Sequence, residues 1–569
     1  MSATASSSSS PAKSRVLEQH DDDIVIVSAV RSAITKGRKG GFKDTKPELI
    51  LSHVLRAVYE KVNLDPKLID DISVGNVLPP GGGASAARMA ALHAGIPVET
   101  SINTVNRQCS SGLTAVTQIA NEIKAGQIEF GIGAGVESMT NGFGAGAVSQ
   151  VSEEVLENKD AEDCLLPMGI TSENVAADYH ISRDRQDAFA ATSFQKAAKA
   201  QKEGRFKDEI LPIKAKWVDP KTEKELEVVV DSDDGIREGV TKEGLAKLKP
   251  AFKKDGSTHA GNASQVSDGA AAVLLTKRST AKKHGLRVLG KFVTSAVVGV
   301  PPRIMGVGPA YAIPKVLQLT NLSLNDIDFF EINEAFASQA IMSVDHLGIP
   351  YEKVNINGGA IALGHPLGAT GARQIVTGLN VAKQYGGRVF VNSMCIGSVG
   401  LLVWMRTQLV LTVDDGAAVV TAEVPSKESS RLRIRFLNWF YNTLSHWVRK
   451  LTYTNEALKR RAECDTKMKT VIADKLGDRA KVMIHIPLVV TEPESQGRGY
   501  SKALLSIVTS LADSRGLASW LFSSNIRNEG FYNKCGFIAA GSFALGDGNP
   551  TWDKDPIVVQ LMIREPKTA

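Results

Sequence analysis

Residues 68–77 read Leu-Ile-Asp-Asp-Ile-Ser-Val-Gly-Asn-Val, and a similar stretch at 324–333 reads Leu-Asn-Asp-Ile-Asp-Phe-Phe-Glu-Ile-Asn. Each is followed by a helical pattern that ends in Gly-Ile-Pro, at 95–97 and at 348–350. A short strand, a glycine-rich turn and a long helical pattern come next, and each half closes on an apolar strand. This repeated order predicts a duplicated α/β core with layers α/β/α/β/α, in which the two glycine-rich turns face each other.

The two glycine-rich turns carry the residues best suited to chemistry. The first reads Asn-Arg-Gln-Cys-Ser-Ser-Gly and holds Cys109, and the second, within residues 358–371, holds His365. A third candidate, Cys395, follows the last apolar strand of the second half. A thiolate nucleophile, an imidazole base and a second thiol that moves protons are the groups that Claisen chemistry on a thioester needs. The chain is therefore interpreted as an acyl-CoA enzyme.

Each candidate residue also has a purely structural interpretation. A single cysteine is most often a small buried apolar residue, and a histidine before a proline can simply cap a helix. Cys109 differs because it precedes the helical pattern at 113–124, where the helix dipole is expected to lower the thiol pKa. Asn333, which also stands between a strand and a helix, could be only an N-cap. Four such turns at strand ends nevertheless favour a shared site.

Composition limits the other functions. At 569 residues the chain is too long for one core, and 43% apolar with 22% charged residues is typical of globular domains. A net charge of +6 argues against a nucleic-acid partner, and the longest apolar run, 399–405, is too short for a membrane helix. The five cysteines form no Cys-x-x-Cys pair, so we expect a reducing compartment and no metal site. We also expect no permanently bound cofactor, with CoA and acetyl-CoA as substrates.

Changes of composition along the chain suggest its domains. Residues 1–22 begin with a serine-rich segment and are expected to be disordered. Residues 23–285 form the first half of the core and include an insertion at about 138–264, which is too long for an ordinary loop. Residues 286–406 form the second half. Residues 410–569 form a separate, smaller α/β domain.

The motifs before residue 397 resemble those of the thiolases, and closely those of the peroxisomal type of 3-ketoacyl-CoA thiolase. The resemblance rests on residues 106–113, 167–175, 261–269, 333–337 and 364–371. It implies that Cys109 is the nucleophile that becomes an acyl-thioester and that His365 is the base that activates it. It also implies that Cys395 protonates the departing acetyl-CoA enolate and then deprotonates the incoming CoA.

The same resemblance assigns the groups that stabilise negative charge on oxygen. Attack on a ketone forms an alkoxide, and a thioester enolate also carries charge on oxygen, so two oxyanion holes are needed. Asn333, through a bound water, and the His365 imidazole match the first. The backbone N–H groups of Cys109 and Gly397 match the second. Ser264 matches a position that contacts the pantetheine of CoA.

The sequence departs from the thiolase pattern directly after Gly397. The family continues with further glycines, whereas Val399 and Leu401 stand here. Two interpretations remain open. Another sequence interrupts the thiolase sequence at this point, or the apolar run still forms the last strand with larger side chains.

Residues 488–504 resemble a second family, the GNAT-type N-acetyltransferases. Leu-Val-Val-Thr at 488–491 is typical of a strand. The following loop resembles the one that binds the acetyl-CoA pyrophosphate through backbone N–H groups at a helix start. It comprises Gln496, Gly497, Arg498, Gly499, Tyr500 and Ser501, the last of which replaces the usual glycine or alanine. Tyr532 matches a tyrosine that often acts as general acid in this family, and it is equally consistent with a core aromatic.

These resemblances imply an acetyl-CoA C-acyltransferase of fatty acid β-oxidation, which uses CoA to cleave 3-ketoacyl-CoA into acetyl-CoA and a shortened acyl-CoA. The C-terminal region would be an acetyl-CoA-dependent N-acetyltransferase. Two alternatives stay open: a biosynthetic acetoacetyl-CoA thiolase, and an inactive thiolase part that serves as a scaffold for the acetyltransferase. The resemblance further implies a homodimer.

A peroxisomal location is also expected from the resemblance, with the cytoplasm or the mitochondrion as alternatives. No complete peroxisomal signal accompanies it, because Asp22 stands where an N-terminal signal that starts at Arg15 would need histidine or glutamine.

Overall fold

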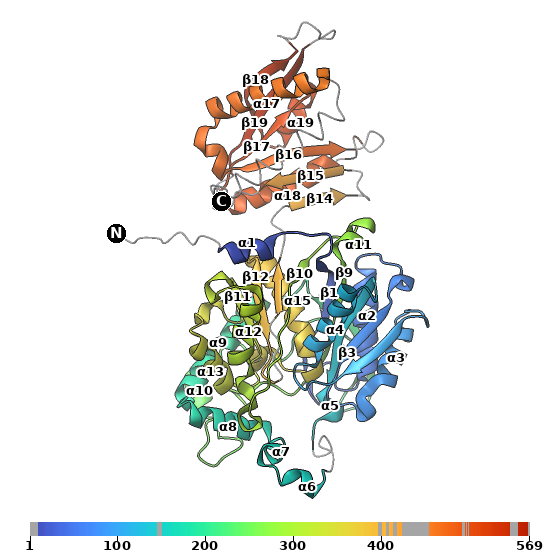
Figure 1. Cartoon of the computed structure of the whole chain (residues 1–569), viewed down its shortest axis with the longest axis vertical. Helices are drawn as coiled ribbons and strands as arrows, with labels where there is room; N and C mark the ends of the chain where they lie inside the picture. Colours follow the sequence, from blue (N-terminus) through green and yellow to red (C-terminus); the bar gives the residue numbers. More distant parts are fainter. Residues whose placement is uncertain are drawn as a thin grey trace, which may run out of the picture. The chain divides into compact units, whose positions relative to one another are not determined.

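The computed structural model describes residues 10–144, 151–396, 401–404, 409–413, 418–423, 455–491, 496, 498, 500–546 and 556–566. The chain divides into two compact units, Met1–Arg406 and Thr407–Ala569, which are described separately (Figure 1). None of the helices in the described ranges is both long enough and apolar enough to cross a membrane.

The first half of the larger unit is built on three parallel strands. β3 (Asp71–Gly75) pairs on one side with β4 (Ser101–Val105) and on the other with β5 (Phe130–Ser138). The connecting helices are α3 (Ala84–His93) and α4 (Ser111–Ala125). β5 is buried along its whole length, as expected for a strand with helices on both faces.

The second half repeats this order. β11 (Phe329–Ile332) pairs in parallel with β12 (Val389–Ser393). The strand expected after residues 348–350 is reduced to a single parallel bridge between Phe330 and Val354. The helices of this half are α12 (Gly308–Thr320), α13 (Ala337–Leu347), α14 (Ala360–Leu363) and α15 (Leu367–Tyr385). The predicted duplication is therefore confirmed.

Antiparallel strands join the two halves. β9 (Ser267–Lys277) lies between β5 and β1 (Ile24–Ser32), and β1 pairs in turn with β10 (Gly290–Phe292). β13 (Leu401–Trp404) lies between β10 and β12, so the apolar run after Gly397 does form a strand of this unit. The order is β11-β12-β13-β10-β1-β9-β5-β3-β4, with β2 (Thr35–Lys36) beside β9 and β6 (Ile210–Leu211) beside β1.

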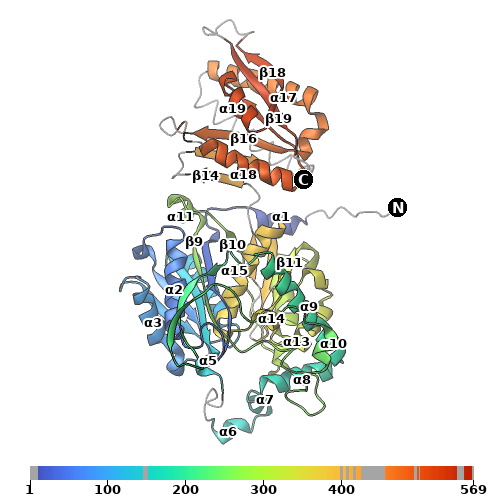
Figure 2. The same ribbon diagram turned by 180° about the vertical axis from the view of Figure 1, so that it is seen from behind.

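Three apolar clusters define five layers. α2 (Pro47–Glu60) and α3 cover one outer face, where Val54 packs with Ile72 of β3. α4 and α15 lie in the middle and share a cluster that includes Val116, Ile375 and Phe390. α12 and α13 cover the other outer face. Figures 1 and 2 show the outer helices on opposite sides of the unit with α4 and α15 between them. The predicted α/β/α/β/α order is confirmed.

Two glycines let the central helices approach at their N-termini. A Cβ atom on Gly112 of α4 would lie 2.6 Å from the carbonyl oxygen of Gly368 in α15. A Cβ atom on Gly371 would lie 2.3 Å from the backbone nitrogen of Leu113. Any side chain at either position would push the helices apart, so glycine is what allows the two predicted turns to meet.

The insertion between β5 and β9 is folded and is anchored to the core by buried charges. Arg31 of β1 donates to Glu209 (2.7 Å) and to Asp233 (2.7 and 2.8 Å), all three being buried. Buried ion pairs of this kind depend on full hydrogen bonding to offset their desolvation. The described elements of the insertion are α5 (Met139–Gly142), α6 (Glu153–Leu156), α7 (Lys159–Asp163), α8 (Met168–Asp178), α9 (Arg183–Lys202), β6, β7 (Ile213–Val218), β8 (Glu225–Val230) and α10 (Lys242–Ala246). Outside the insertion, α11 (Arg278–Lys283) follows β9.

The expectation of disorder up to residue 22 is wrong for residues 11–17, which form helix α1 (Pro11–Leu17). Ser10 caps this helix, and Ala12 and Val16 are buried against the outer cluster of the second half. Lys13 donates to Asp328 at 2.8 Å. Two small apolar residues one helical turn apart were too weak a sequence pattern to predict this contact.

The smaller unit contains a six-stranded sheet. Its order is β14 (Leu409–Val413), β15 (Ala418–Glu423), β16 (Ile484–Thr491), β17 (Ser519–Ser523), β19 (Ile557–Arg564) and β18 (Ile538–Leu545). Its helices are α17 (Asn455–Lys475), α18 (Tyr500–Ser514) and α19 (Glu529–Lys534). Leu505, Val508 and Phe537 lie in its core.

Candidate active site

The Cys109 turn connects β4 to α4 and is tightly wound. Gln108 has a φ of 48°, which is uncommon for a residue with a side chain, and the Arg107 amide donates to Ser111 at 2.9 Å. Ser110 donates to the carbonyl of Ile396, which ties this turn to the segment that follows β12. Cys109 is 1% exposed. The turn therefore holds the sulfur in a closed, defined position before the first residue of α4.

His365 stands between α14 and α15, and its ring is oriented by Thr370. Its Nδ1 atom lies 2.7 Å from the hydroxyl of Thr370, which itself donates to the carbonyl of Pro366 at 2.9 Å. Because the hydroxyl proton is used in that second bond, Nδ1–H must donate to Thr370. The other ring nitrogen, Nε2, is therefore the atom at which a proton can be gained or lost.

Asn333 and Cys395 reach the same point because they follow neighbouring parallel strands. Asn333 comes directly after β11, and its backbone amide donates to Ser393 of β12 at 2.9 Å. Its side-chain nitrogen lies 3.2 Å from Nε2 of His365 and 3.4 Å from the sulfur of Cys395. The two sulfurs and a ring nitrogen of His365 all lie within 4.8 Å of one another. The structure thus brings together the four side chains that the sequence analysis singled out.

The two cysteines form a coupled pair with opposite shifts. A hydrogen bond to Cys395, followed by burial, raises the pKa of the Cys109 thiol. The hydrogen bond from Cys109 lowers the pKa of Cys395, and the contact and charge of His365 and the Asn333 amide lower it further. The helix start was expected to lower the thiol pKa of Cys109, but in this resting arrangement the neighbouring sulfur and burial outweigh the helix terminus and raise it instead.

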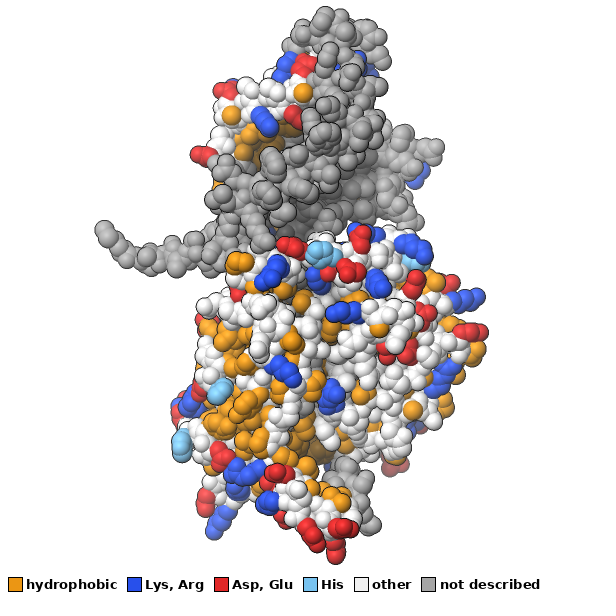
Figure 3. Space-filling model, in the orientation of Figure 1, with side chains coloured by type: hydrophobic (Ala, Val, Ile, Leu, Met, Phe, Trp, Pro, Cys, Tyr) orange, Lys and Arg blue, Asp and Glu red, His pale blue; other side chains and the backbone are white. Residues whose placement is uncertain are grey.

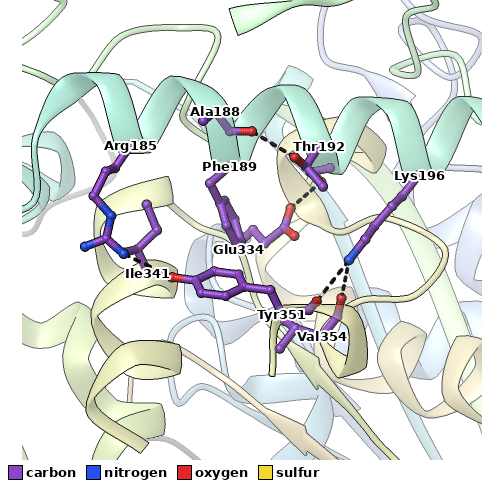
Figure 4. A pocket seen from close by; sticks show the side chains of 10 residues that line it. Arg185, Ala188, Phe189, Thr192, Lys196, Glu334, Ile341, Tyr351 and Val354 are labelled. Carbon is purple, nitrogen blue, oxygen red and sulfur yellow. Dashed lines mark hydrogen bonds between the residues drawn. The ribbon is translucent and has the colours of Figure 1, made fainter. Parts of the chain in front are cut away.

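Glu334 shows how the insertion supports the Asn333 turn. The buried Glu334 carboxylate accepts from Ser193 of α9 at 2.6 Å and from Asn355 at 2.7 Å. It lines a cavity of about 280 Å³, which Figure 4 shows between α9 and the segment that carries Tyr351. Lys196, also from α9, donates across this cavity to the carbonyl of Val354 at 2.8 Å. Ser193 and Asn355 thus hold Glu334, the residue that follows Asn333, from two sides.

Glu137 is a buried residue near the site that sequence reasoning missed. It is the penultimate residue of β5, and its carboxylate accepts from the amides of Leu78 (3.2 Å) and Gly368 (3.0 Å). Burial raises its pKa to about 7. It therefore links the end of β5 to the first turn of α15. In the sequence, the one sign of this role was a lone glutamate at the end of an apolar strand.

One predicted residue, Ser264, lies at the edge of this site. The amide of Ser264 donates to Ala335 at 2.9 Å, two residues beyond Asn333 in the chain. The next residue, Gln265, accepts from the His365 amide at 3.2 Å. Ser264 is thus close to both turns. Gly397, the predicted donor of the second oxyanion hole, lies outside the described residues.

In the smaller unit, β16 and β17 separate at the predicted loop. They pair in parallel only at Ile484–Ser519 and His485–Trp520. Beyond that point Thr491 is joined by a hydrogen bond to Ser501 in the first turn of α18. Gln496 and Arg498 precede this helix, whereas Gly497 and Gly499 lie outside the described residues. Strands whose pairing ends beside a helix start leave backbone groups unpaired, an arrangement that suits a pantetheine chain and a phosphate.

Tyr532 lies in the core of the smaller unit. It is 6% exposed and stands edge-on to Phe531 and Phe537. Burial raises the pKa of its phenol. These contacts explain Tyr532 as a core aromatic, and its role as general acid stays a prediction.

On the face drawn in Figure 3, basic and acidic side chains are interspersed over the larger unit. No extended basic surface stands out among the described residues of that face, which agrees with the small net charge.

Comparison with known families identifies three matching regions. Residues 24–279 match the family described as "Thiolase, N-terminal domain", and residues 286–403 match "Thiolase, C-terminal domain". Residues 470–537 match "Acetyltransferase (GNAT) family".

Curated relatives align with the larger unit. The peroxisomal 3-ketoacyl-CoA thiolase of Yarrowia lipolytica is 57% identical over 383 residues, which cover 67% of this chain and 92% of that protein. The peroxisomal 3-ketoacyl-CoA thiolase B of Rattus norvegicus is 57% identical over 377 residues, covering 66% and 88%. The solved structure of the dimeric peroxisomal thiolase of Saccharomyces cerevisiae is 51% identical with a TM-score of 0.65, covering 69% of this chain and all of that one.

Proposed function

The chain belongs to the thiolase family and carries a C-terminal GNAT-family domain, and we propose that its larger unit cleaves 3-ketoacyl-CoA with CoA. The observation that carries this proposal is the gathering of Cys109, His365 and Cys395 within 4.8 Å, with Asn333 in contact with two of them. The products are acetyl-CoA and an acyl-CoA shortened by two carbons, as in fatty acid β-oxidation. The substrate class is that of the relatives named above.

Acylation begins when the Cys109 thiol gives up its proton. His365 is held with Nε2 toward the thiols, so Nε2 receives this proton as Cys109 attacks the 3-keto carbon and passes it to the neighbouring Cys395 sulfur. The bond between carbons 2 and 3 then breaks, which leaves an acyl-thioester on Cys109 and the enolate of acetyl-CoA. Cys395 returns the proton to the enolate carbon.

In deacylation Cys395 first accepts a proton instead of giving one. Cys395 accepts the proton of the incoming CoA thiol, and the CoA thiolate attacks the thioester on Cys109. The tetrahedral intermediate collapses to release the shortened acyl-CoA, and the proton returns to the Cys109 sulfur. No permanently bound cofactor takes part in this scheme.

Two groups of donors stabilise the oxyanions. Asn333 and Nε2 of His365 face the same point, and Oδ1 of Asn333 has no hydrogen-bond partner among the described residues, which leaves it free to hold a water. In this proposal the backbone N–H groups of Cys109 and Gly397 supply the second set. Loss of one such donor costs about 2.7–4 kcal/mol of transition-state stabilisation.

The arrangement favours an active enzyme over a scaffold. Support comes from the proximity of Cys109, His365, Cys395 and Asn333 and from the pairing of β13 with both β10 and β12. Thiolysis rates with acetoacetyl-CoA and with a long-chain 3-ketoacyl-CoA decide between a biosynthetic and a degradative enzyme. A strong preference for the four-carbon substrate would overturn the degradative assignment.

The decisive test is the identity of the acylated residue. Mass spectrometry of protein that has reacted with 3-ketoacyl-CoA and then been quenched should place the acyl group on Cys109. Cys109→Ala should abolish thiolysis. The exposed Cys164 provides the control, because Cys164→Ala should retain full activity. An acyl group found on Cys395 would reject the assigned roles.

The relatives also support a homodimer and a peroxisomal location for this chain, as the resemblance implied. Among the described strands β4 is the edge of its sheet, and Met89 and Val98 beside it are 59% and 69% exposed. An unpaired edge next to exposed apolar residues is a surface suited to a second copy. A monomeric mass in solution would contradict the dimer.

For the smaller unit we propose acetyl-CoA-dependent transfer to an amine. Support comes from the family match at residues 470–537 and from the separation of β16 and β17 beside the start of α18. In this proposal Gln496 to Ser501 cradle the pyrophosphate, and β16 offers backbone hydrogen bonds to pantetheine.

A further inference from the structure

The side chains of the larger unit's site form a ligand set for a soft metal ion. Among the described residues, Cys109, His365 and Cys395 are the one group of three cysteine, histidine or carboxylate side chains close enough to hold a metal. We propose that this group binds Zn²⁺ or a similarly thiophilic cation reversibly, and that the bound ion blocks acyl transfer. The inhibitory part of this proposal rests on the proposed function, whereas the binding part does not.

The distances are compatible with coordination. In a tetrahedral zinc site, Zn–S is about 2.3 Å and Zn–N about 2.0–2.1 Å, so ligand atoms stand roughly 3.5–3.8 Å apart. The three ligand atoms here already lie within 4.8 Å of one another. Side-chain rotations that bring each pair closer by about 1.3 Å at most therefore complete three of the four positions.

The imidazole is presented in the form that a metal needs. Because Thr370 accepts from Nδ1–H and donates to Pro366, Nε2 directs its lone pair toward the sulfurs whenever it carries no proton. Metal-binding histidines are held in the same way, by a second group that accepts from the other ring nitrogen. The site therefore has its supporting hydrogen bond without any metal-specific adaptation.

Asn333 offers a candidate for the fourth position. Its side-chain nitrogen lies 3.2 Å from Nε2 and 3.4 Å from the Cys395 sulfur, and its Oδ1 atom has no partner among the described residues although Asn333 is fully buried. A half-turn of the amide exchanges the two atoms and directs oxygen toward the ion. A water could also fill this position, as in zinc sites with three protein ligands.

Ligand chemistry sets the selectivity. Two sulfurs and one imidazole nitrogen favour Zn²⁺, Cd²⁺ or Cu⁺ and disfavour Mg²⁺ and Ca²⁺, which prefer oxygen. Both sulfurs bind the ion as thiolates, so binding releases to solvent any proton that they carry. Since the ion then occupies the nucleophile, the base and the second thiol together, no group remains to attack the substrate.

The test uses Co²⁺ as a spectroscopic probe on the full-length protein, after treatment with a chelator and in the absence of oxygen. We expect one Co²⁺ per chain with thiolate-to-cobalt absorption, displaced by Zn²⁺ and left unchanged by Mg²⁺. Cys395→Ala should abolish this absorption, whereas Cys164→Ala, which alters an exposed cysteine, should leave it intact. Absorption that persists in Cys395→Ala would overturn the site.

Thr370 supplies a sharper comparison. Thr370→Val should weaken Co²⁺ binding about tenfold, and Thr370→Ser should restore it, because only the hydroxyl holds Nδ1. Thermal unfolding of each variant shows that the fold is retained. Absence of any cobalt absorption at millimolar Co²⁺ would overturn the metal site, but it would not contradict the proposed thiolysis. Cobalt binding without acylation of Cys109 would instead leave the site standing and reject the proposed function.

Discussion

Gly112→Ala tests whether close contact of the two central helices is what assembles the site. The new Cβ atom would lie 2.6 Å from the Gly368 carbonyl oxygen and 3.0 Å from the Ala372 nitrogen. Because an ordinary contact needs about 3.4 Å, the N-terminus of α15 has to retreat by roughly 0.8 Å. His365 stands only three residues before Gly368, so its ring moves away from Cys109.

The expected loss of activity exceeds the loss of stability. Overpacking costs about 1–3 kcal/mol, of which the better helix propensity of alanine offsets about 0.5–1 kcal/mol. A displacement of about 1 Å between reacting groups costs on the order of 10²-fold in rate. We therefore expect kcat/KM for thiolysis to fall about 10²-fold, with net destabilisation in urea of no more than about 2.5 kcal/mol.

Gly299→Ala is the matched control, because a Cβ atom at Gly299 meets nothing within 4 Å. It should change the free energy of unfolding by about 0.5 kcal/mol at most and leave kcat/KM unchanged. If Gly112→Ala retains kcat/KM within twofold, close helix approach does not position the site and the reasoning fails.

The remaining predictions concern protons and the smaller unit. His365→Ala should slow both thiolysis and the alkylation of Cys109 by iodoacetamide near neutral pH, and an unchanged alkylation rate would count against its role as base. Glu137 has a folded pKa of about 7, above its ordinary value of 4.5, so its contribution to stability is complete below pH 4.5 and is lost as the pH rises through 7. In urea titrations the free energy of unfolding should therefore decline less between pH 5 and 8 in Glu137→Gln than in the unaltered protein. Equal slopes would refute the raised pKa of Glu137. Cys395→Ser should slow acylation of Cys109 in a single turnover, because a hydroxyl is a far weaker proton acceptor than a thiolate, and acylation at the native rate would exclude Cys395 from the first step. Gly499→Asp should reduce acetyl-CoA binding by calorimetry from two sites per chain to one, since the new charge opposes the phosphates, and two remaining sites would refute the predicted loop.

The sequence was sufficient to predict the duplicated core and the four side chains of the site, for a definite physical reason. Parallel strands of one sheet end at the same edge, so residues that follow them meet, and a repeat in the sequence reveals which strands are equivalent. Asn333 and Cys395 follow β11 and β12 in this way, whereas Cys109 follows β4 of the other half and reaches them through the close approach of α4 and α15. The glycines of the two turns marked where backbones approach each other.

The supporting residues could not be predicted, because each acts through a contact between segments far apart in the chain. Ser193 of the insertion supports Glu334, and Glu137 reaches Gly368 across more than half of the larger unit's sequence. Helix α1 was missed because its two small apolar residues gain their value only from the cluster they cover. Thr370 had a local signal, one and a half helical turns after His365, but its hydrogen bond depends on the ring orientation.

The order of the two cysteine pKa values shows most clearly what a local pattern leaves out. A helix start favours a thiolate on Cys109, yet the resting site raises the pKa of Cys109 and lowers that of Cys395, because Cys109 hydrogen-bonds to the Cys395 sulfur and His365 and Asn333 also lie against it. This arrangement suits the chemistry. A sulfur that holds its proton at rest does not react before substrate arrives, and the acceptor is already beside it. The proton that leaves Cys109 during attack is then held where the acetyl-CoA enolate forms, so one proton serves both the activation of the nucleophile and the release of the first product.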